Sequence, residues 1–194
     1  HARVGHYVGF DPSYEDIYSS TDGAVSRYKP LKDKFPGFGK VNYIQADGGV
    51  LLNSKEQSKA IPNLSSENKG LIDKIFSKKN YFDIINSSFA IHYLFGNNLM
   101  IKNLIQNIKD NLRVGGFVTF EIFDAEAVMK SMGDKNSLTS YYTDEDGKKV
   151  KCWDIVKKFN GELKDEPGQA VDVHMSWIME ENKYQEEYLV SRKL

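Results

Sequence analysis

An aromatic segment that contains a histidine carries the residues best suited to chemistry. The run from Tyr81 to Leu94 begins as an apolar strand and ends with Phe89, His92 and Tyr93. Flat rings can stack on a nucleic-acid base, and an imidazole can form hydrogen bonds with it. Such a histidine is more often a packing residue when it is considered alone. We favour a ligand role because the segment leaves a strand where open α/β sheets bind ligands.

Two carboxylates also follow candidate strands. Asp11 closes the apolar strand 7–11, and Asp47 follows the alternating strand 40–46, before Gly48 and Gly49. A strand-terminal Asp can accept both hydroxyl groups of a ribose, although singly it is more often a turn residue or a helix cap. Asp47 can accept from an adenine amino group or simply form an Asp-Gly turn. Because consecutive parallel strands end at the same edge, the pair favours a ligand site.

Strands and helices alternate around these residues, which predicts an α/β fold with a right-handed parallel crossover. Apolar spacing and turn residues predict central strands at 82–86 and 117–123 and amphipathic helices at 67–78 and 97–112. The apolar stripe of the second helix consists of Met100, Leu104, Ile105, Ile108 and Leu112. We expect a helix within 12–28, a loop at 30–39, a surface excursion at 53–68 and a turn at Gly115-Gly116.

The pattern changes after Asp124. We expect a helix at 125–132, an antiparallel hairpin of strands 138–143 and 148–156 around an Asp-Gly turn, and a strand at 171–179. The expected organisation is a single domain, 1–194, with a cofactor-binding core at 1–124 and a substrate-side extension at 125–194.

Composition limits the classes of protein. The chain has 194 residues, 40% of them hydrophobic, a net charge of −1 and one cysteine, Cys152. This length favours one core, and no apolar run approaches the ~20 residues of a membrane span. We expect a soluble protein of a reducing cytoplasm, without a disulfide, metal site or membrane contact. The densest basic cluster is Lys148, Lys149, Lys151, Lys157 and Lys158, for which a solvated hairpin edge is favoured over an RNA-binding patch.

The first residues place Asp11 unusually early. In doubly wound folds, the acidic residue that binds ribose lies about 20 residues after a glycine-rich loop, at the end of the second strand. The chain begins with His1 and reaches Asp11 without such a loop. We therefore expect the first strand and its loop to be missing, and the sequence to be an internal piece of a larger polypeptide.

These residues resemble the messenger-RNA cap guanine-N7 methyltransferases, including those of large DNA viruses. The run from Ser88 to Phe95, Ser-Phe-Ala-Ile-His-Tyr-Leu-Phe, is similar to the family's Gln-Phe-x-x-His-Tyr-x-Phe. Residues 8–11, 44–47 and 115–124 look like the family's ribose-binding, adenine-contacting and following strands. Glu187-Tyr-Leu-Val190 resembles Pro-Glu-Tyr-Val-Val. The chain departs from the family at Ser88, where the family has Gln, and at Gln185-Glu186, where it has Val-Pro.

The resemblance implies a Rossmann-like class I methyltransferase sheet, mostly parallel with helices on both faces, that uses S-adenosylmethionine. It implies no metal and no side chain acting as acid or base. By resemblance, the cofactor-binding residues are Asp11, Asp47, Gly48, Ser88 and Phe89. The residues implied for the cap guanine are Phe89, His92, Tyr93 and Glu187.

The resemblance further implies two adjoining pockets, one for the cofactor and one for the capped 5′ end of an RNA. The implied partners are other capping domains of the same polypeptide or a stimulatory subunit. The compartment would be the host cytoplasm or virion for a viral protein, and the nucleus for a cellular one. Two alternatives stay open: a methyltransferase for a small molecule, and a methyltransferase-like binding module without catalysis, which the absent glycine loop favours.

Overall fold

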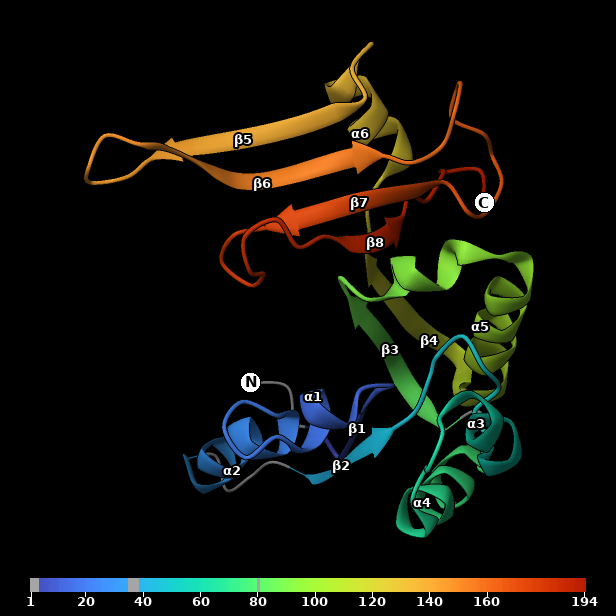
Figure 1. The fold of residues 1–194 in the computed structure, drawn as a ribbon. Coiled ribbons are helices and arrows are strands. Elements are labelled where there is room, and N and C mark those ends of the chain that lie inside the picture. Colours follow the sequence, from blue (N-terminus) through green and yellow to red (C-terminus); the bar gives the residue numbers. More distant parts are fainter. Residues whose placement is uncertain (1–3, 35–38, 80) are drawn as a thin grey trace. The chain divides into compact units, whose positions relative to one another are not determined.

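The computed structural model describes residues 4–34, 39–79 and 81–194, which form mixed α/β structure (Figure 1). The chain divides into two compact units. The first unit contains residues up to Ile84 together with Lys102–Phe117, and the second contains Ile85–Ile101 and Val118–Leu194. The mixed α/β class is confirmed, whereas the predicted division of one domain at residue 124 stays a prediction.

A parallel pair of strands organises the first unit. Strands β1 (His6–Asp11) and β2 (Lys40–Gln45) pair in register from His6 with Lys40 to Asp11 with Gln45. The backbone N–H of Ala46 extends the pairing by donating to the Asp11 carbonyl at 3.0 Å. Both predicted strands are confirmed. The register brings Asp11 and the residues that follow Gln45 to the same edge of the pair.

Two helices, rather than one, follow β1. Helix α1 (Tyr14–Tyr18) ends at Ser19, whose carbonyl accepts from the side chain of Ser26, and α2 (Ala24–Lys34) begins after this turn. The loop predicted from Pro30 is wrong up to Lys34, because Pro30 lies inside α2. A proline removes only one helical hydrogen bond, and the lysines around it favour a helix. Residues 35–38 of that predicted loop lie outside the described residues.

The predicted surface excursion at 53–68 is also wrong, since it contains helix α3 (Ser54–Ala60) and the start of α4 (Ser66–Phe76). The side chain of Asn53 caps α3 by accepting from the N–H of Glu56, and Ser65 caps α4 in the same way. A polar cap followed three residues later by Glu is a helix-start signal, which Asn53 and Glu56 carry. The helix predicted at 67–78 is confirmed as α4.

The core of the first unit lies between β2 and these helices. Its buried side chains are Ile44, Ala46, Ile61, Leu64, Ile72 and Ile75. Each buried Ile or Leu side chain stabilises the fold by about 1.5–3 kcal/mol relative to an exposed one. This packing holds α3 and α4 against the strand that leads to Asp47.

Strands β3 (Phe82–Ser88) and β4 (Leu112–Glu121) form a second pair, and helix α5 (Asn98–Asn111) lies between them in the sequence. Figure 1 shows their arrows pointing the same way, as the predicted crossover requires. Burial of β3 on both faces was expected and is wrong. Ile84 is 61% exposed, and no residue of β3 is fully buried.

Two further expectations about this region are corrected. The turn predicted at Gly115-Gly116 lies within β4, where Gly115 has a φ of 78°. A Cβ on Gly116 would meet the Asp83 carbonyl oxygen at 2.8 Å, so the strand needs glycine there. The buried residues of α5 are Asn107 and Asn111 rather than its apolar stripe, because the Asn107 amide holds a neighbouring loop and the Asn111 amide donates to the Asn107 carbonyl.

A four-stranded antiparallel sheet dominates the second unit, in the order β5-β6-β7-β8. The strands are β5 (Ser137–Thr143), β6 (Lys149–Lys157), β7 (Ala170–Met175) and β8 (Gln185–Tyr188), and helix α6 (Ala125–Met132) precedes them. The predicted helix and hairpin are confirmed. The strand predicted at 171–179 ends early, because the N–H groups of Ile178 and Met179 turn back to the Met175 carbonyl. Trp177, beyond the end of β7, is 63% exposed.

The core of the second unit joins α6 to this sheet. Its buried side chains are Ala125, Met132, Ile155, Val171, Val173 and Leu189. Alternate residues of β7 point into it, as the predicted two-residue period requires. The sheet and α6 therefore fix the position of β8, which carries Glu187.

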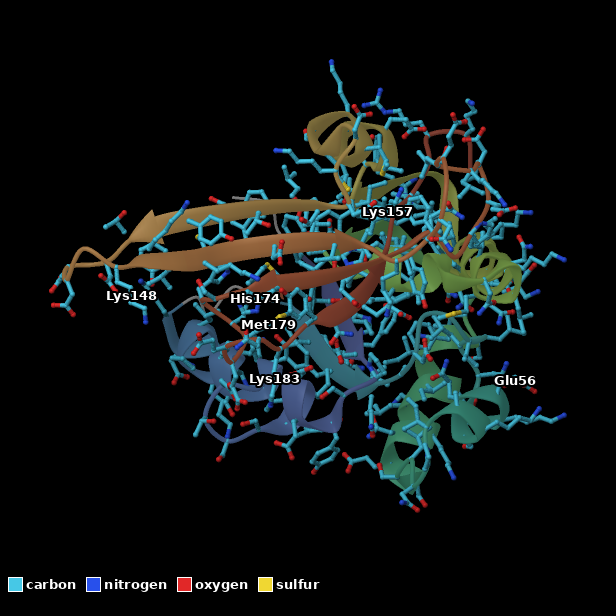
Figure 2. The ribbon with its side chains drawn as sticks, turned by 45° about the horizontal axis from the view of Figure 1, so that its top comes forward. Glu56, Lys148, Lys157, His174, Met179 and Lys183 are labelled. Carbon is cyan, nitrogen blue, oxygen red and sulfur yellow. The ribbon has the colours of Figure 1, made fainter. Side chains whose placement is uncertain are left out.

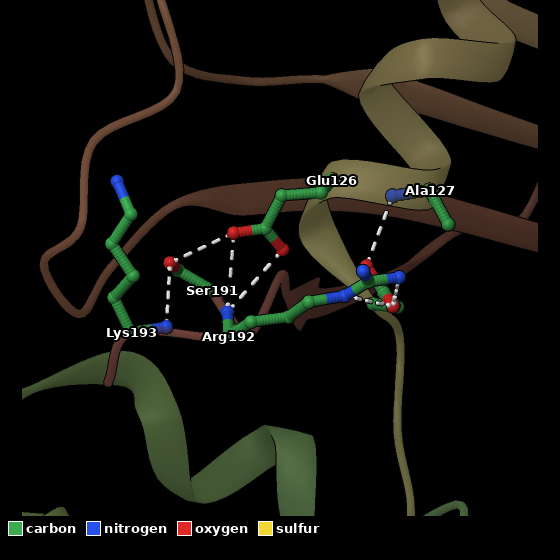
Figure 3. Close-up of polar contacts among 6 residues, drawn as sticks. Glu126, Ala127, Ser191, Arg192 and Lys193 are labelled. Atoms are coloured by element: carbon green, nitrogen blue, oxygen red, sulfur yellow. Dashed lines mark hydrogen bonds and ion pairs between the residues drawn. The ribbon is translucent and has the colours of Figure 1, made fainter.

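The segment after β8 is fastened to the start of α6 (Figure 3). Val190 pairs with Asp124 in a parallel bridge, and the backbone N–H of Arg192 donates to Glu126. Asp124 caps α6 by accepting from the N–H of Ala127, and the Arg192 guanidinium donates to its other oxygen at 2.8 Å from Nε. These contacts hold residues 189–192 beside Phe123.

The guanidinium of Arg192 and the N–H of Ala127 lower the pKa of Asp124. A carboxyl group whose pKa is lower in the folded state stabilises the fold above its unfolded pKa, and that contribution is lost as the pH falls through the folded pKa. We expect Arg192→Ala to raise the pKa of Asp124 and to lower stability at neutral pH. The loss should shrink as the pH falls below about 4. NMR titration and urea unfolding across this range measure both effects.

Asp124→Asn provides the control, since an amide still caps the helix but does not titrate here. In that background, the effect of Arg192→Ala should not change with pH below neutrality. A loss of stability in Arg192→Ala that is constant from neutral pH to acid, with Asp124 present, contradicts the role of this pair.

Candidate functional site

Asp11 ends β1 as a half-buried carboxylate. Its Oδ1 accepts from the backbone N–H of Ser13 at 2.8 Å, which is the turn geometry expected as the alternative to ligand binding. Within the described ranges, Oδ2 receives no hydrogen bond. Burial raises the pKa of Asp11, the Ser13 N–H lowers it, and the charge of Asp16 raises it. A carboxylate that is poorly solvated gains most from additional donors, such as hydroxyl groups.

Asp47 lies in a loop that three side-chain amides hold. The buried amide of Gln57 accepts from the Asp47 N–H at 2.8 Å and donates to the Asp47 carbonyl at 2.8 Å. Asn107 donates to the carbonyls of Gly48 and Val50 and accepts from the N–H of Leu52. Asn103 donates to the Gly49 carbonyl at 2.9 Å. The loop from Asp47 to Leu52 is therefore fixed by bonds to its backbone.

The turn alternative for Asp47 is also present, since its Oδ1 accepts from the N–H of Gly49 at 2.8 Å. The turn and a ligand role are compatible, because a carboxylate has two oxygens and several acceptor positions.

The amides of this loop were missed by the sequence reasoning. Asn103, Asn107 and Asn111 recur every four residues, so they share one face of α5. Asparagine is a poor helix former, and three on one helical face signal hydrogen bonds to another segment. That signal could have identified two of the three amides; Gln57 offered none comparable.

In the second unit, His92, Tyr93 and Glu187 come together, as predicted. His92 and Tyr93 lie on the 3₁₀ helix η1 (Ile91–Gly96), and Glu187 lies on β8. The Tyr93 hydroxyl donates to Glu187 Oε1 at 3.0 Å, and His92 Nε2 lies 3.0 Å from Glu187 Oε2. His92 and Glu187 are each only 2% exposed.

This cluster leaves buried polar atoms unsatisfied. The close approach of Nε2 and Oε2 is not aligned as a hydrogen bond, so neither atom has a hydrogen-bond partner in the described part of the chain, and nor does His92 Nδ1. A buried polar atom without a partner costs about 1–3 kcal/mol. Such atoms are retained in a protein where a ligand or a water molecule supplies the missing hydrogen bond, or where their function requires it.

Two contacts position the cluster. The N–H of Gly168, just before β7, donates to the Phe95 carbonyl at 2.9 Å and ties η1 to the sheet. Gly168 has a φ of 88°, which favours glycine. The ring of Phe123 packs edge-on against His92, with centroids 5.3 Å apart. The sequence reasoning placed Phe123 in a strand and missed this contact.

Phe89 differs from the rest of the site in its backbone and its exposure. Its φ is 52°, a left-handed conformation that is rare for a bulky residue, and its side chain is 70% exposed. The N–H of Phe89 donates to the Glu121 carbonyl at 3.2 Å, which holds the strained backbone. Strained backbone clusters at functional sites. Ser88 beside it is also exposed, and its hydroxyl accepts from Asn86.

Two of the five lysines in the basic cluster of the hairpin form ion pairs with neighbouring carboxylates of the described chain. Figure 2 labels Lys148 and Lys157, which flank β6 at opposite ends. Lys151 pairs with Asp154, and Lys158 pairs with Asp172 and Glu186. These contacts favour the predicted solvated edge over an RNA-binding patch.

No helix in the described ranges has both the length and the apolar character needed to cross a membrane. No group of three or more His, Cys, Asp or Glu side chains there is arranged to hold a metal ion.

The predicted site residues thus form two sets. Asp11, Asp47 and Gly48 belong to the first unit, and Ser88, Phe89, His92, Tyr93 and Glu187 belong to the second. The first set can accept hydrogen bonds from hydroxyl and amino groups. The second combines an exposed ring with a buried carboxylate and an imidazole, which can bind a flat molecule that carries both donors and acceptors.

Residues 2–145 match the mRNA (guanine-N(7))-methyltransferase domain family. The chain belongs to this family, because the match covers most of its length. The matched residues include both carboxylates of the first unit and the segment from Ser88 to Tyr93, and they end before Glu187.

Two relatives have names that refer to capping. The chain is 33% identical over 189 residues to a probable mRNA-capping enzyme of Acanthamoeba polyphaga mimivirus, covering 97% of this chain and 16% of that protein. It is 28% identical over 150 residues to an mRNA cap guanine-N(7) methyltransferase of Lodderomyces elongisporus, covering 75% of this chain and 24% of that protein. The chain therefore spans a small part of either relative.

Replacing the buried amide of Gln57 tests whether this side chain holds the loop after β2 in place. Gln57→Leu keeps a side chain of similar size but leaves the N–H and carbonyl of Asp47 without their partners. We expect the free energy of unfolding in urea to fall by roughly 2–3 kcal/mol. Gln106→Leu, on the exposed surface of α5, is the matched control and should change stability little. Equal losses of stability in the two variants would contradict the role of Gln57 in holding the loop.

The strained backbone of Phe89 predicts that one substitution there makes the protein more stable than the wild type. Phe89→Gly removes the steric cost of a positive φ and little buried surface, so the free energy of unfolding should rise by about 1 kcal/mol. Phe89→Ala also removes the ring but keeps the strain, so it should not be stabilised. Chemical denaturation of both variants distinguishes strain from packing. A destabilised Phe89→Gly would show that the ring contributes to the fold.

Proposed function

We propose that this chain carries the residues that transfer a methyl group from S-adenosylmethionine to N7 of the guanine cap of mRNA. Membership of the family supports the reaction, and both relatives are named for capping, which favours RNA over a small-molecule substrate. The observation that carries the proposal is the set of buried, unpartnered atoms of His92 and Glu187.

These atoms match the hydrogen-bonding edge of guanine. Glu187 Oε2 is an acceptor without a donor, and the N1 and N2 groups of guanine are donors. His92 Nδ1, which also lacks a partner among the described residues, would donate to O6 in the tautomer that carries its proton there, since Nε2 faces Glu187. The exposed rings of Phe89 and, in part, Tyr93 would cover the base by stacking.

The first unit fits the adenosyl part of the cofactor. Oδ2 of Asp11, without a donor in the described ranges, would accept from the ribose hydroxyls, and Asp47 and Gly48 would contact the adenine. Ser88 and Phe89 complete the proposed cofactor-binding set. When bound, S-adenosylmethionine supplies a methyl group already activated by the sulfonium. The family implies the class I, Rossmann-like sheet, to which the parallel pairs would belong.

The side chains would act by position and charge rather than by proton transfer. N7 of guanine offers a lone pair and carries no proton, so no general base is needed. Holding the reacting atoms about 3–3.5 Å apart and in line supplies much of the rate. Methylation makes the guanine cationic. The buried carboxylate of Glu187 would therefore stabilise the transition state more than the neutral substrate.

The proposed partners follow from the relatives. The capped 5′ end of an RNA is the substrate, and other capping domains or a stimulatory subunit would act with this chain, since the mimivirus relative is named as a capping enzyme and is far longer.

Two substitutions in the natural protein test the cap site. Glu187→Ala removes the acceptor for the guanine edge, and Tyr93→Ala removes a wall of the pocket and a donor to Glu187. Both should reduce methylation of a capped RNA by about 100-fold or more. Glu187→Ala removes the charge where positive charge develops, and Tyr93→Ala removes the donor and the ring that position the carboxylate and the base. S-adenosylmethionine binding, measured by calorimetry, should be unchanged.

Glu186→Ala is the matched control, because Glu186 neighbours Glu187 on β8 but pairs with Lys158 on the surface. It should retain methylation. Wild-type turnover in Glu187→Ala or Tyr93→Ala would refute the cap-site assignment. Loss of cofactor binding in either variant would show that the residue belongs to another site.

A further inference from the structure

A hollow in the first unit gathers lysines that are far apart in the sequence. It has a volume of about 180 Å³ and is lined by Gly5, His6, Lys40, Leu71, Lys74, Ile75, Lys78 and Tyr81. Lys40 begins β2, and Lys74 lies in the last turn of α4. No carboxylate is among these lining residues.

The three lysines have no acidic partners. None of them forms an ion pair with a carboxylate in the described ranges, and the residues outside those ranges include no Asp or Glu. This contrasts with the hairpin cluster, where Lys151 and Lys158 are paired. Like charges that converge without counter-charges repel one another, so an anion bound in the hollow lowers their energy.

The ordinary role of lysine near a helix end explains only part of this arrangement. Lys74 and Lys78 at the end of α4 can complement the helix dipole. Lys40 cannot, because it belongs to a strand. The convergence of residues from two elements favours a binding site.

An aromatic ring accompanies the charges. Tyr81 is 40% exposed, and the ammonium of Lys78 lies 5.2 Å from the centre of its ring. His6 fixes Tyr81 in place, because its Nδ1 lies 3.1 Å from the Tyr81 hydroxyl while its Nε2 is bonded to Asn42. Lysines beside an exposed aromatic ring are the combination that binds single-stranded nucleic acid, since bases stack while ammonium groups meet phosphates. An acidic peptide would pair with the lysines through its carboxylates, and that binding does not require an exposed aromatic ring.

The hollow is separate from the edge that carries Asp11. His6 and Lys40 face each other at the amino ends of β1 and β2, and Asp11 lies five residues further along β1. At a rise of about 3.3 Å per residue, the two ends are roughly 16 Å apart. A ligand in the hollow would therefore not occupy the proposed adenosyl site.

We propose that this hollow binds the backbone phosphates of single-stranded RNA through Lys40, Lys74 and Lys78. Tyr81 stacks on a base beside them. This contact increases the affinity for the RNA chain and does not recognise the cap. It does not depend on the role proposed for His92 and Glu187.

Binding of an uncapped, fluorescently labelled oligoribonucleotide tests the proposal. The triple variant K40Q/K74Q/K78Q should bind about tenfold or more weakly than the wild type. The slope of log affinity against log salt concentration should fall in magnitude by about 2, since each lost phosphate contact on a single strand removes about 0.7. The lysines are exposed, so the thermal unfolding temperature should be unchanged.

The triple variant K148Q/K149Q/K157Q is the matched control, because it changes the net charge equally on the hairpin. It should keep the wild-type affinity and salt slope. Equal losses in the two variants would attribute binding to bulk charge and overturn the proposal, as would unchanged binding in the first variant.

Two further measurements test the identity of the ligand. Tyr81→Leu should weaken RNA binding without changing the salt slope, because stacking releases no counterions; unchanged affinity would refute the stacking role. A polyglutamate peptide should not displace the RNA at an equal concentration of charges. Displacement would show that the hollow recognises carboxylates, and the assignment to RNA phosphate would be wrong.

Discussion

A polar group removed from water needs a hydrogen-bond partner, and this constraint separates the buried polar side chains into two kinds. In the first unit, Gln57, Asn68 and Asn107 bond to the backbone of neighbouring segments, and of their neighbours only Asn111 keeps an oxygen without a partner in the described chain. In the second unit, His92 and Glu187 retain atoms without partners in the described chain. Satisfied amides hold the structure, whereas unsatisfied groups are available to a ligand.

The same contrast applies to charge. Lysines that are dense in the sequence pair with acids of the same sheet, as Lys158 does with Glu186. Lysines that are distant in the sequence meet around one hollow without acids. Sequence density of charge is therefore a poor guide to a binding surface here, because β7 and β8 bring Asp172 and Glu186 to Lys158, which a linear pattern does not display.

The sequence predicted much of the fold and of the site. Short-range patterns identified β1, β2, α4, α6 and the hairpin, and the resemblance brought His92, Tyr93 and Glu187 together although 94 residues separate Tyr93 from Glu187. Errors arose where tertiary contacts outweigh local preference. Pro30 lies in a helix, Gly115 lies within a strand, and the buried face of α5 consists of asparagines. The strain at Phe89 had no signal, because backbone angles follow from how both ends of a loop are held.

Side-chain amides of the chain itself hold the backbone of the loop from Asp47 to Leu52. Amides from α3 and α5 engage its carbonyls and N–H groups, so its conformational entropy is lost when the protein folds rather than when a ligand binds. A molecule that contacts Asp47 would bind to a loop whose conformation is already fixed by folding. Its association would then be limited by encounter and by removal of water, and its residence time by the contacts it makes.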